Sequence, residues 1–248
     1  MAETLRGADI VIRVLEQRGV ARVFTLSGNH IMSLFDAALG RPIDLVHVRH
    51  EAAAVHMADA WGRLTGEPGI AMVTGGPGHA NAVGALFTAL GAESPVVLLS
   101  GHAATWELGR GGFQELDQAA MAAPVTKASW VVRSIATLAE EVGRASDISR
   151  SGRPGPVHLS LPSDVLDAAI AGDLIVWPER MRGGGVPLHE GIADAMLSAL
   201  QAASRPVVLA GPHMSGRQGR TVLAELERAT LVPAIVRRRG SWCGCPTA

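Results

Sequence analysis

The chain has 248 residues, of which 48% are hydrophobic and 18% charged, and its formal net charge is −1. This length can bury a substantial core in one large domain, or in one domain and part of a second. The balanced charge excludes a basic surface for nucleic acid, and no apolar run approaches the roughly 20 residues of a membrane-spanning helix.

Short apolar runs alternate along the chain with stretches that have apolar residues at helical spacing. The first four runs follow one another at intervals of about 22–26 residues, the spacing of a strand, a crossover helix and the next strand. The runs are continuous, as expected where helices cover both faces of a sheet. We therefore predict an α/β fold with an open, mostly parallel sheet and helices on both faces, and leave the strand order open. Strands are predicted at residues 20–26, 43–48, 69–74, 95–100 and 156–161, and helices at 4–18, 30–39, 50–65, 79–91 and 135–148.

Residues 171–187 interrupt this rhythm with three successive glycines and no helical pattern, so we predict a linker there. One βαβ unit of this kind of fold follows, and a single unit cannot close a core alone. We therefore divide the chain into a first domain at 1–170, the linker, and the incomplete start of a second α/β domain at 188–248. The elements predicted in the second domain are helices at 188–203 and 220–229 and strands at 206–210 and 232–236.

Both ends of the chain bear on its location. The first ten residues, MAETLRGADI, contain acidic residues and no apolar core, which argues against a secretory signal. Cys243 and Cys245 stand too close together for a structural disulfide, so we expect a cytoplasmic protein. Two thiols without further ligands make a weak metal site, and no metal-binding residue is predicted.

In an open parallel sheet, ligand sites lie beyond the carboxyl ends of the strands. Four predicted loops at that edge carry polar residues and glycines. They are residues 26–30, 47–51, 74–81 and 109–117.

Glu51, at the start of a predicted helix, has two interpretations. It either offsets the helix dipole, which is worth about 0.3–1 kcal/mol, or serves as a functional carboxylate in a water-poor crevice near His50 and His56. A zinc-binding HExxH helix is excluded, because His56 follows His50 at a spacing that puts the two on different faces.

The glycine-rich turn at residues 75–78 also has two interpretations. It either presents backbone N–H groups to a phosphate or lets a strand and a helix pack closely. It is not a dinucleotide-binding fingerprint, because Asn81 stands where the third glycine should be, and it is not a P-loop, because the only lysine in the chain is Lys127.

Five segments follow one another in an order and spacing that match a known family: VFTLSGNHIMSLFDA (23–37), VRHEAAAVHMADAWGRLTGEPG (48–69), TGGPGHANAVGALFTAL (74–90) with ESPVVLLSG (93–101), GGFQELDQ (111–118) and SGRPGPVHLSLPSDV (151–165). The sequence resembles the thiamine-diphosphate-dependent decarboxylases and carboligases, in particular the acetolactate synthase group. The resemblance covers the start of the chain to about residue 168, which is the pyrimidine-binding domain of that family, so residues 1–170 are expected to form that domain. RPVVLAGPHM at 205–214 looks like the opening of the central domain.

The resemblance implies thiamine diphosphate as the cofactor and decarboxylation or carboligation of 2-oxo acids as the activity. It makes Glu51 the catalytic carboxylate that hydrogen-bonds the aminopyrimidine ring, and His30 a candidate acid or base near the reacting carbon. It overrules the phosphate interpretation of the glycine turn, because the family holds the diphosphate on another domain. Glu51 and the cofactor-binding Gly76, Pro77, Gly78 and Asn81 are expected around the pyrimidine, and Ser27, Gly28, Asn29, His30, Phe113 and Gln114 on the substrate side.

Departures from the acetolactate synthase pattern leave the reaction open. Residues 25–29, TLSGN, replace the usual G-x-P-G-G, and His79-Ala80 replaces the usual Ala-Thr. Residues 116–118 and 127–129 look closer to the oxalyl-CoA decarboxylases. A thiamine-diphosphate lyase of that type is therefore an alternative, as is a non-catalytic nucleotide-binding α/β module.

The family also has parts that this sequence lacks. It binds Mg²⁺ and the diphosphate through a Gly-Asp-Gly motif in a further domain, whereas Gly172-Asp173 is followed here by Leu174. We expect the chain to be incomplete and inactive alone, as a truncated or frameshifted product, a fragment, or one subunit of a split enzyme. The complete enzyme is expected to be a homodimer or higher oligomer, or to use a partner chain that carries the diphosphate domain, with no nucleic acid or membrane partner. Whether FAD binds the central domain, as in acetolactate synthases, is left open.

Overall fold

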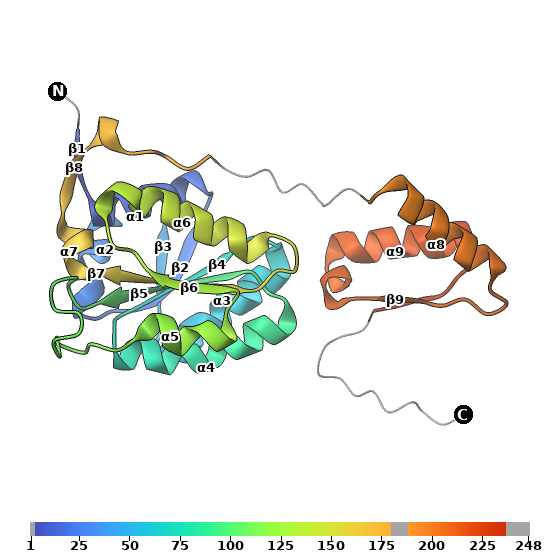
Figure 1. Ribbon diagram of the computed structural model, residues 1–248, viewed down its shortest axis with the longest axis horizontal. Coiled ribbons are helices and arrows are strands. Elements are labelled where there is room, and N and C mark those ends of the chain that lie inside the picture. Colours follow the sequence, from blue (N-terminus) through green and yellow to red (C-terminus); the bar gives the residue numbers. More distant parts are fainter. Residues whose placement is uncertain (1–2, 180–187, 237–248) are drawn as a thin grey trace. The chain divides into compact units, whose positions relative to one another are not determined.

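Six parallel strands form one sheet in the computed structural model, which describes residues 3–179 and 188–236. The sheet belongs to the first of two units into which the chain divides, residues 1–182 and 183–248. Its strand order is β3-β2-β4-β5-β7-β6, and it confirms the predicted open parallel α/β sheet (Figure 1). The strands are β2 (Arg22–Leu26), β3 (Asp44–His47), β4 (Gly69–Val73), β5 (Val96–His102), β6 (Ala128–Val131) and β7 (Pro156–Pro162).

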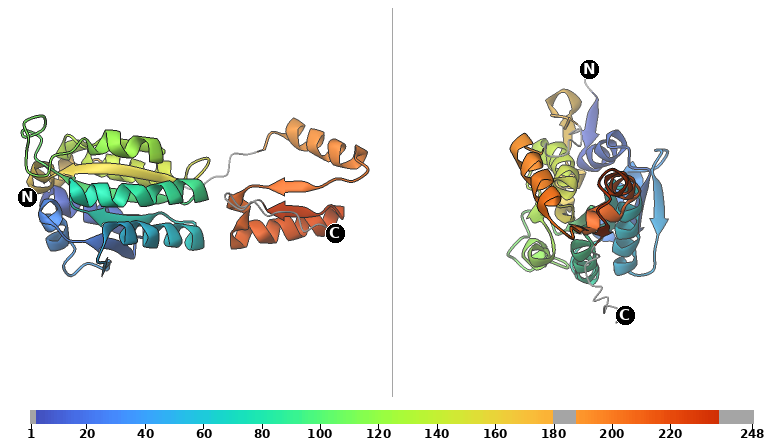
Figure 2. Two further views of the ribbon diagram at one scale, coloured as in Figure 1. Left: turned by 90° about the horizontal axis from the view of Figure 1, so that it is seen from below. Right: turned by 90° about the vertical axis from the view of Figure 1, so that its right-hand side faces the viewer.

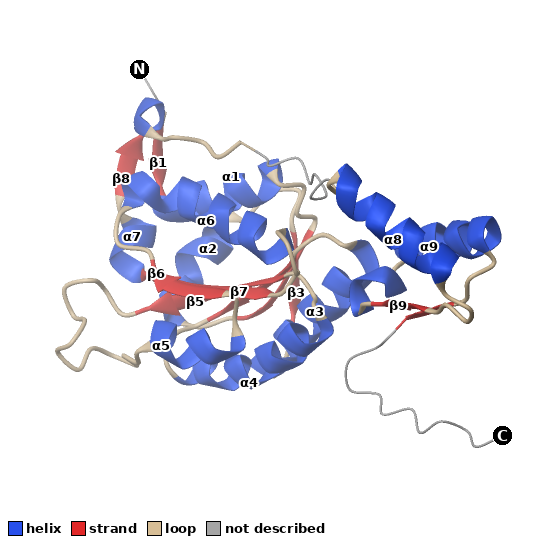
Figure 3. Cartoon of the chain, turned by 45° about the vertical axis from the view of Figure 1, so that its right-hand side comes forward, coloured by secondary structure: helices blue, strands red, loops and turns tan. Residues whose placement is uncertain are grey.

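Helices cover both faces of this sheet, because its three central strands are apolar on both sides. Every residue of β4, β5 and β7 is buried. One face packs against α1 (Gly7–Gln17), α2 (Met32–Ala37), α6 (Ile135–Arg150) and α7 (Ser163–Asp167). The opposite face packs against α3 (Glu51–Thr65), α4 (Pro77–Ala92) and α5 (Gln118–Ala122). Figure 3 shows the two helical layers on either side of the strands, and the left panel of Figure 2 looks onto the layer of α3 and α4.

The first unit differs from the predicted elements at its start and at one edge of the sheet, and its short helices α5 and α7 are further additions. The helix predicted from residue 4 begins at Gly7, and the residues before it form β1 (Thr4–Arg6), paired antiparallel with β8 (Ala169–Ala171). The strand gives way to the helix at Gly7. No side chain fits at this position, because a Cβ there would lie 2.1 Å from the carbonyl oxygen of Val165. The edge strand β6, with four half-buried residues, was not predicted because it has no continuous buried apolar run.

The stretch predicted as a linker starts with residues that pack against the first unit. Ala171 is paired in β8, Ile175 is buried, and the Arg18 guanidinium donates a hydrogen bond to the carbonyl oxygen of Glu179 over 3.2 Å. Residues 180–187, the rest of that stretch, lie outside the described residues, as does the tail that contains Cys243 and Cys245.

The second unit has the predicted order of helix, strand, helix and strand. Its elements are α8 (Glu190–Ala202), β9 (Val208–Ala210), α9 (Arg217–Thr230) and β10 (Ala234–Val236), with β9 and β10 parallel. Among the side chains described in this unit, only Leu223 and Val232 are buried. Across both units, none of the helices in the described ranges has the length and apolar character to span a bilayer.

Candidate functional site

The strand order reverses between β2 and β4, so the carboxyl ends of these two strands form a topological switch point. From β2 the chain crosses to β3 on one side and then to β4 on the other. The loops that leave the two strands diverge at such a switch point and leave a crevice between them. The loop that follows β2 starts at Ser27, and the loop that follows β4 starts at Thr74. Both are among the four loops predicted to carry the site.

Glu51 is the first residue of α3 and is only 9% exposed. The helix N-cap is His50, whose Nδ1 accepts a hydrogen bond from the backbone N–H of Ala52 over 3.2 Å. The Glu51 carboxylate is therefore not needed as the cap. A carboxylate that only offset the helix dipole could stay in water, whereas burial of a carboxylate carries a cost unless hydrogen bonds satisfy it.

Asn81, from α4, supplies such a bond. Its Nδ2 donates to Glu51 Oε2 over 3.0 Å, although the two residues are 30 positions apart. The other oxygen, Oε1, faces Gly78, where an added Cβ would lie 3.3 Å from it. One oxygen of the carboxylate is thus held by an amide, and the other borders a place where the chain has no side chain.

The glycine turn that leads into α4 has a conformation that other residues rarely adopt. Gly76 has φ +59° and ψ −114°, and a Cβ there would lie 2.5 Å from the carbonyl oxygen of Gln114. Pro77 opens the helix, where its missing N–H costs nothing. A Cβ on Gly78 would lie 2.7 Å from Thr74 Cγ2. The glycines therefore allow close packing, which is the second of the two interpretations of this turn.

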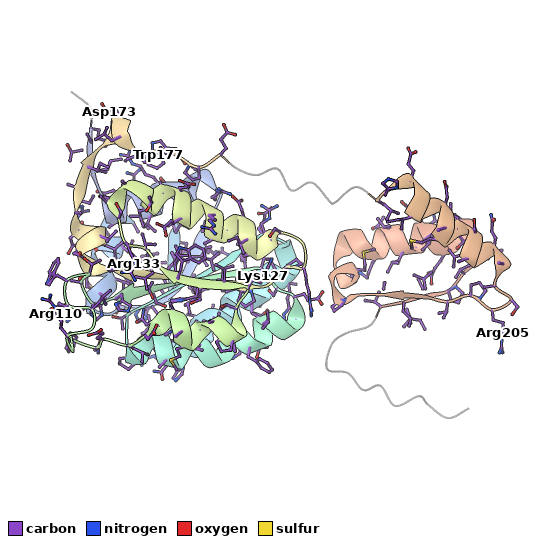
Figure 4. The ribbon with its side chains drawn as sticks, viewed as in Figure 1. Arg110, Lys127, Arg133, Asp173, Trp177 and Arg205 are labelled. Carbon is purple, nitrogen blue, oxygen red and sulfur yellow. The ribbon has the colours of Figure 1, made fainter. Side chains whose placement is uncertain are left out.

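A phosphate would find few free donors in this turn. The N–H of Gly76 donates to Gln118 Oε1 over 2.8 Å, and the N–H of Gly78 donates to the carbonyl oxygen of Gly75 over 3.3 Å. The only lysine also lies elsewhere, since Figure 4 shows Lys127 at the end of the first unit opposite Arg110. Its Nζ donates to the carbonyl oxygens of Ile148 and Ser151.

Gln118 is a part of this site that the sequence analysis did not single out. It is 1% exposed, and its amide accepts from Gly76 while donating to the carbonyl oxygen of Gly101 over 3.1 Å and to Ser160 Oγ over 2.8 Å. Two signals could have found it: it ends the segment GGFQELDQ that matches the family, and it follows Asp117, which caps α5 by accepting a hydrogen bond from the N–H of Ala120 over 3.1 Å.

The loop that follows β2 contacts the glycine loop through Thr74. His30 is buried, and its Nδ1 lies 3.2 Å from Thr74 Oγ1. A Cβ on Gly28 would lie 2.5 Å from Thr74 Cβ. Burial lowers the pKa of His30, partly offset by the backbone of Phe113, so the neutral imidazole is favoured. Ser27 and Asn29 are exposed.

The loop that follows β5 borders the same site from another side. The Phe113 ring lies 5.9 Å from the His30 ring, centre to centre, and is 62% exposed. Gln114 has a left-handed backbone, φ +55°, and its carbonyl oxygen faces Gly76. Glu115 closes the loop by accepting hydrogen bonds from the N–H groups of Gly109, Gly111 and Gly112, which lower the pKa of its carboxyl group.

A pair of buried histidines lies beside the site. The His79 ring is 4.5 Å from the His158 ring, and both side chains are fully buried. His79 Nδ1 lies 2.9 Å from Ser100 Oγ, and His158 Nδ1 lies 2.8 Å from Ser129 Oγ. Burial lowers the pKa of His79 to about 4, although the backbone of Gln118 opposes the shift, and lowers that of His158 well below its usual value. Both are therefore neutral near physiological pH.

Residues 5–121 match the family model described as the thiamine pyrophosphate enzyme, N-terminal TPP binding domain. The first unit is thus similar to the N-terminal domain of the thiamine pyrophosphate enzymes. The predicted site residues from the β2 loop to Gln114 all lie inside the matched segment.

Curated relatives place the chain near the acetolactate synthases. It is 41% identical over 215 residues to the acetolactate synthase isozyme 3 large subunit of Escherichia coli, covering 84% of this chain and 37% of that protein. It is 33% identical over 248 residues to the probable acetolactate synthase large subunit of Methanocaldococcus jannaschii, covering 96% of this chain and 41% of that protein. It is also 44% identical over 160 residues to 2-hydroxyacyl-CoA lyase 2 of Danio rerio, covering 64% of this chain and 26% of that protein. The chain thus spans about two fifths of the length of each synthase and about a quarter of the length of the lyase.

The residues around Glu51 fit the pyrimidine end of thiamine diphosphate. A buried carboxylate with one constrained oxygen can hydrogen-bond a ring nitrogen, and the missing side chains at Gly76 and Gly78 keep the turn close beside it. The occupied N–H groups of the turn do not favour the diphosphate end.

Proposed function

We propose that the first unit binds the aminopyrimidine ring of thiamine diphosphate and forms the pyrimidine-binding part of an enzyme that acts on 2-oxo acids, as an acetolactate synthase does. The observation that carries this proposal is the buried Glu51 carboxylate, hydrogen-bonded by Asn81 and facing Gly78 at the switch point of the sheet. The match to the thiamine pyrophosphate enzyme model supports the choice of cofactor. When bound, thiamine diphosphate supplies a carbon nucleophile and an electron sink.

Each residue around Glu51 has a defined part in this proposal. Glu51 Oε1 would hydrogen-bond the ring and hold the shared proton there, while Asn81 keeps Oε2 in place. A hydrogen bond between Glu51 and the ring would be strong because the carboxylate is shielded from water. The effective dielectric constant of such a buried site is low. Gly76, Pro77 and Gly78 shape the recess without placing side chains in it.

The substrate side is formed by the loops that follow β2 and β5. Burial keeps His30 in its neutral form, and its ring lies 5.9 Å from the exposed ring of Phe113, so its imidazole can act as a base on the substrate side. The remaining residues proposed to face the substrate are Ser27, Gly28, Asn29 and Gln114.

We further propose that the chain is inactive alone. Mg²⁺ and the diphosphate would be held by a domain outside this chain, in a homo-oligomer or on a partner chain, and the chain's coverage of about two fifths of its acetolactate synthase relatives supports this. FAD binding stays open.

A second candidate is a thiamine-diphosphate lyase of the oxalyl-CoA decarboxylase type. The 44% identity to a protein named 2-hydroxyacyl-CoA lyase 2 favours it, as does the likeness of residues 116–118 and 127–129 to the oxalyl-CoA decarboxylases. Both candidates use the same pyrimidine site, so they differ only in the substrate.

The first experiment is a titration of the chain with thiamine, followed by the backbone amide signals in nuclear magnetic resonance spectra. Signals of Glu51, Gly76, Gly78 and Asn81 are expected to shift. Glu51→Gln should weaken binding by about tenfold or more, because a hydrogen bond to a charged group is lost, while the fold is kept.

The matched control is Asp59→Asn on the same helix. Asp59 is also a buried carboxylate, but it pairs with Arg63 and lies away from Asn81 and Gly78, so binding should stay within about twofold of wild type. Equal binding by wild type and Glu51→Gln would reject the role of Glu51. Shifts with adenine nucleotides instead of thiamine would support the nucleotide-binding module. Micromolar binding of thiamine diphosphate with Mg²⁺ by the isolated chain would contradict the need for a further domain.

A further inference from the structure

We infer that Gln118 is a positioning residue for the pyrimidine site, fixing the peptide at which the glycine turn begins through its hydrogen bond to Gly76. This inference rests on the proposed function. Gln118 touches neither Glu51 nor Asn81 in the hydrogen bonds of the described residues, so it acts through the backbone of the turn.

The Gln118 side chain joins three separate parts of the chain. Oε1 accepts from the N–H of Gly76, while Nε2 donates to the carbonyl oxygen of Gly101 in β5 and to Ser160 Oγ in β7. Each of these contacts spans 17 residues or more along the sequence. At 1% exposure, water cannot replace any of them. The glycine turn is thereby tied to two of the fully buried strands.

The backbone at Gly76 depends on such a fixed acceptor. Its φ of +59° with ψ of −114° lies outside the regions that other residues populate, and glycine there has many alternatives available. The Gln114 carbonyl oxygen closes one side of the turn. On the other side, a Cβ at Gly75 would lie 2.7 Å from the carbonyl oxygen of Gly101 and 3.1 Å from Gln118 Oε1. Gln118 therefore holds the backbone of Gly76 in one of the conformations that are open to glycine.

The conformation of Gly76 sets the start of α4, and with it the position of Asn81 relative to Glu51. Pro77 is the first helical residue after Gly76, and Gly78 and Asn81 follow within the first turns. Asn81 reaches Glu51 Oε2 at 3.0 Å, a distance that a shift of the helix start would lengthen. Small displacements of the groups that contact a ligand lower the affinity of a site for that ligand.

Glutamine suits this place because it offers an acceptor and two donors at once. Methionine has nearly the same length and no amide, so Gln118→Met removes the acceptor of Gly76 and both donated bonds. Ser160→Ala is the matched control, because it deletes one partner of Nε2 and leaves the Gly76 bond in place.

The test measures three quantities for wild type, Gln118→Met and Ser160→Ala at a temperature well below unfolding: the exchange rate of the Gly76 amide proton, the dissociation constant for thiamine, and the melting temperature. In Gln118→Met the Gly76 amide should exchange about tenfold faster and thiamine should bind about tenfold more weakly, because a buried donor has lost its acceptor. Ser160→Ala should lower the melting temperature while both other values stay within about twofold of wild type.

Gln118→Asn provides a second variant if Gln118→Met does not fold, since the shorter amide keeps the polarity but cannot span the distance to Gly76. A lower melting temperature with unchanged Gly76 exchange and unchanged thiamine affinity would overturn the inference, as would equal losses of affinity in Ser160→Ala. A wild-type chain that gives no thiamine shifts would instead reject the proposed function and with it the positioning role.

Discussion

In the first unit every residue of β4, β5 and β7 is buried, whereas in the second unit the central residues of β9 and β10, Leu209 and Ile235, are 71% and 56% exposed. The strand pairs are parallel in both. The helices differ in the same way, since α1 buries seven residues and α8 buries none.

This difference shows what a parallel sheet needs. Parallel strands are stable when helices cover both faces, and a single βαβ unit cannot provide that cover. The first unit has two core clusters, one on each side of the sheet. Its site therefore lies at the edge of a well-packed framework that can hold Glu51 and Asn81 in place.

The largest expected effect is a loss of packing in the central strands. Leu159→Ala in β7, at a fully buried position, should lower the free energy of unfolding of the first unit by about 2–5 kcal/mol because it leaves a cavity. Leu209→Ala in β9 should change the stability of the second unit by less than about 0.5 kcal/mol, because its side chain is already in water. Urea unfolding followed by amide signals from each unit measures both, and equal losses would break the comparison.

Acid should destabilise the first unit selectively. The pKa of His79 is lowered from 6.5 to about 4 by burial, so the unfolded chain binds a proton more readily than the folded chain. Stability is then full above the unfolded pKa and is lost as the pH falls from about 6.5 towards 4, by about 2 kcal/mol between pH 7 and pH 5 for His79 alone.

The buried His158 adds to this loss in the same direction. His79→Ala should therefore flatten the dependence of the free energy of unfolding on pH, measured by urea titration at pH 7, 6 and 5. None of the side chains described in the second unit is a buried histidine, so its amide signals should broaden at the same urea concentration at each pH. A slope unchanged by His79→Ala would contradict the prediction.

The smallest expected effects come from two helix ends with the same backbone conformation. The residue that caps the carboxyl end of α3 is Gly66, with φ +76°, and the corresponding residue of α9 is Leu231, with φ +57°. Gly66→Ala should destabilise the first unit by about 1 kcal/mol, because only glycine adopts this conformation without strain. Leu231→Gly should stabilise the second unit by up to about 1 kcal/mol for the same reason, since Leu231 is 89% exposed and loses little packing. Thermal unfolding of both variants measures the signs, and a loss in Leu231→Gly would contradict the argument.

The longer helices and the central strands were predictable because their signals are local. Runs such as residues 69–74 and 156–161 are continuous and apolar, and the observed strands β4 and β7 fall on them. The short strands β1, β8 and β6 were not predicted, since three or four partly exposed residues carry no clear periodicity.

Some features of the candidate site were also predictable from the sequence, and others were not. The position of Glu51 at a helix start and the glycines of the turn were legible in the sequence. The burial of Glu51 and the role of Gln118 were not, because a glutamine at the start of a short helix looks like any surface residue.

The sequence by itself determined the fold class, the order of the longer elements and the family that the first unit resembles. Only the tertiary structure decided the strand order, the contact between Asn81 and Glu51, and the link from Gln118 to Gly76. Periodicity reports which side of an element is apolar, whereas these contacts join residues 30 and 42 positions apart. Which distant residues meet depends on which strands become neighbours in the sheet, and that is set by the packing of the whole unit.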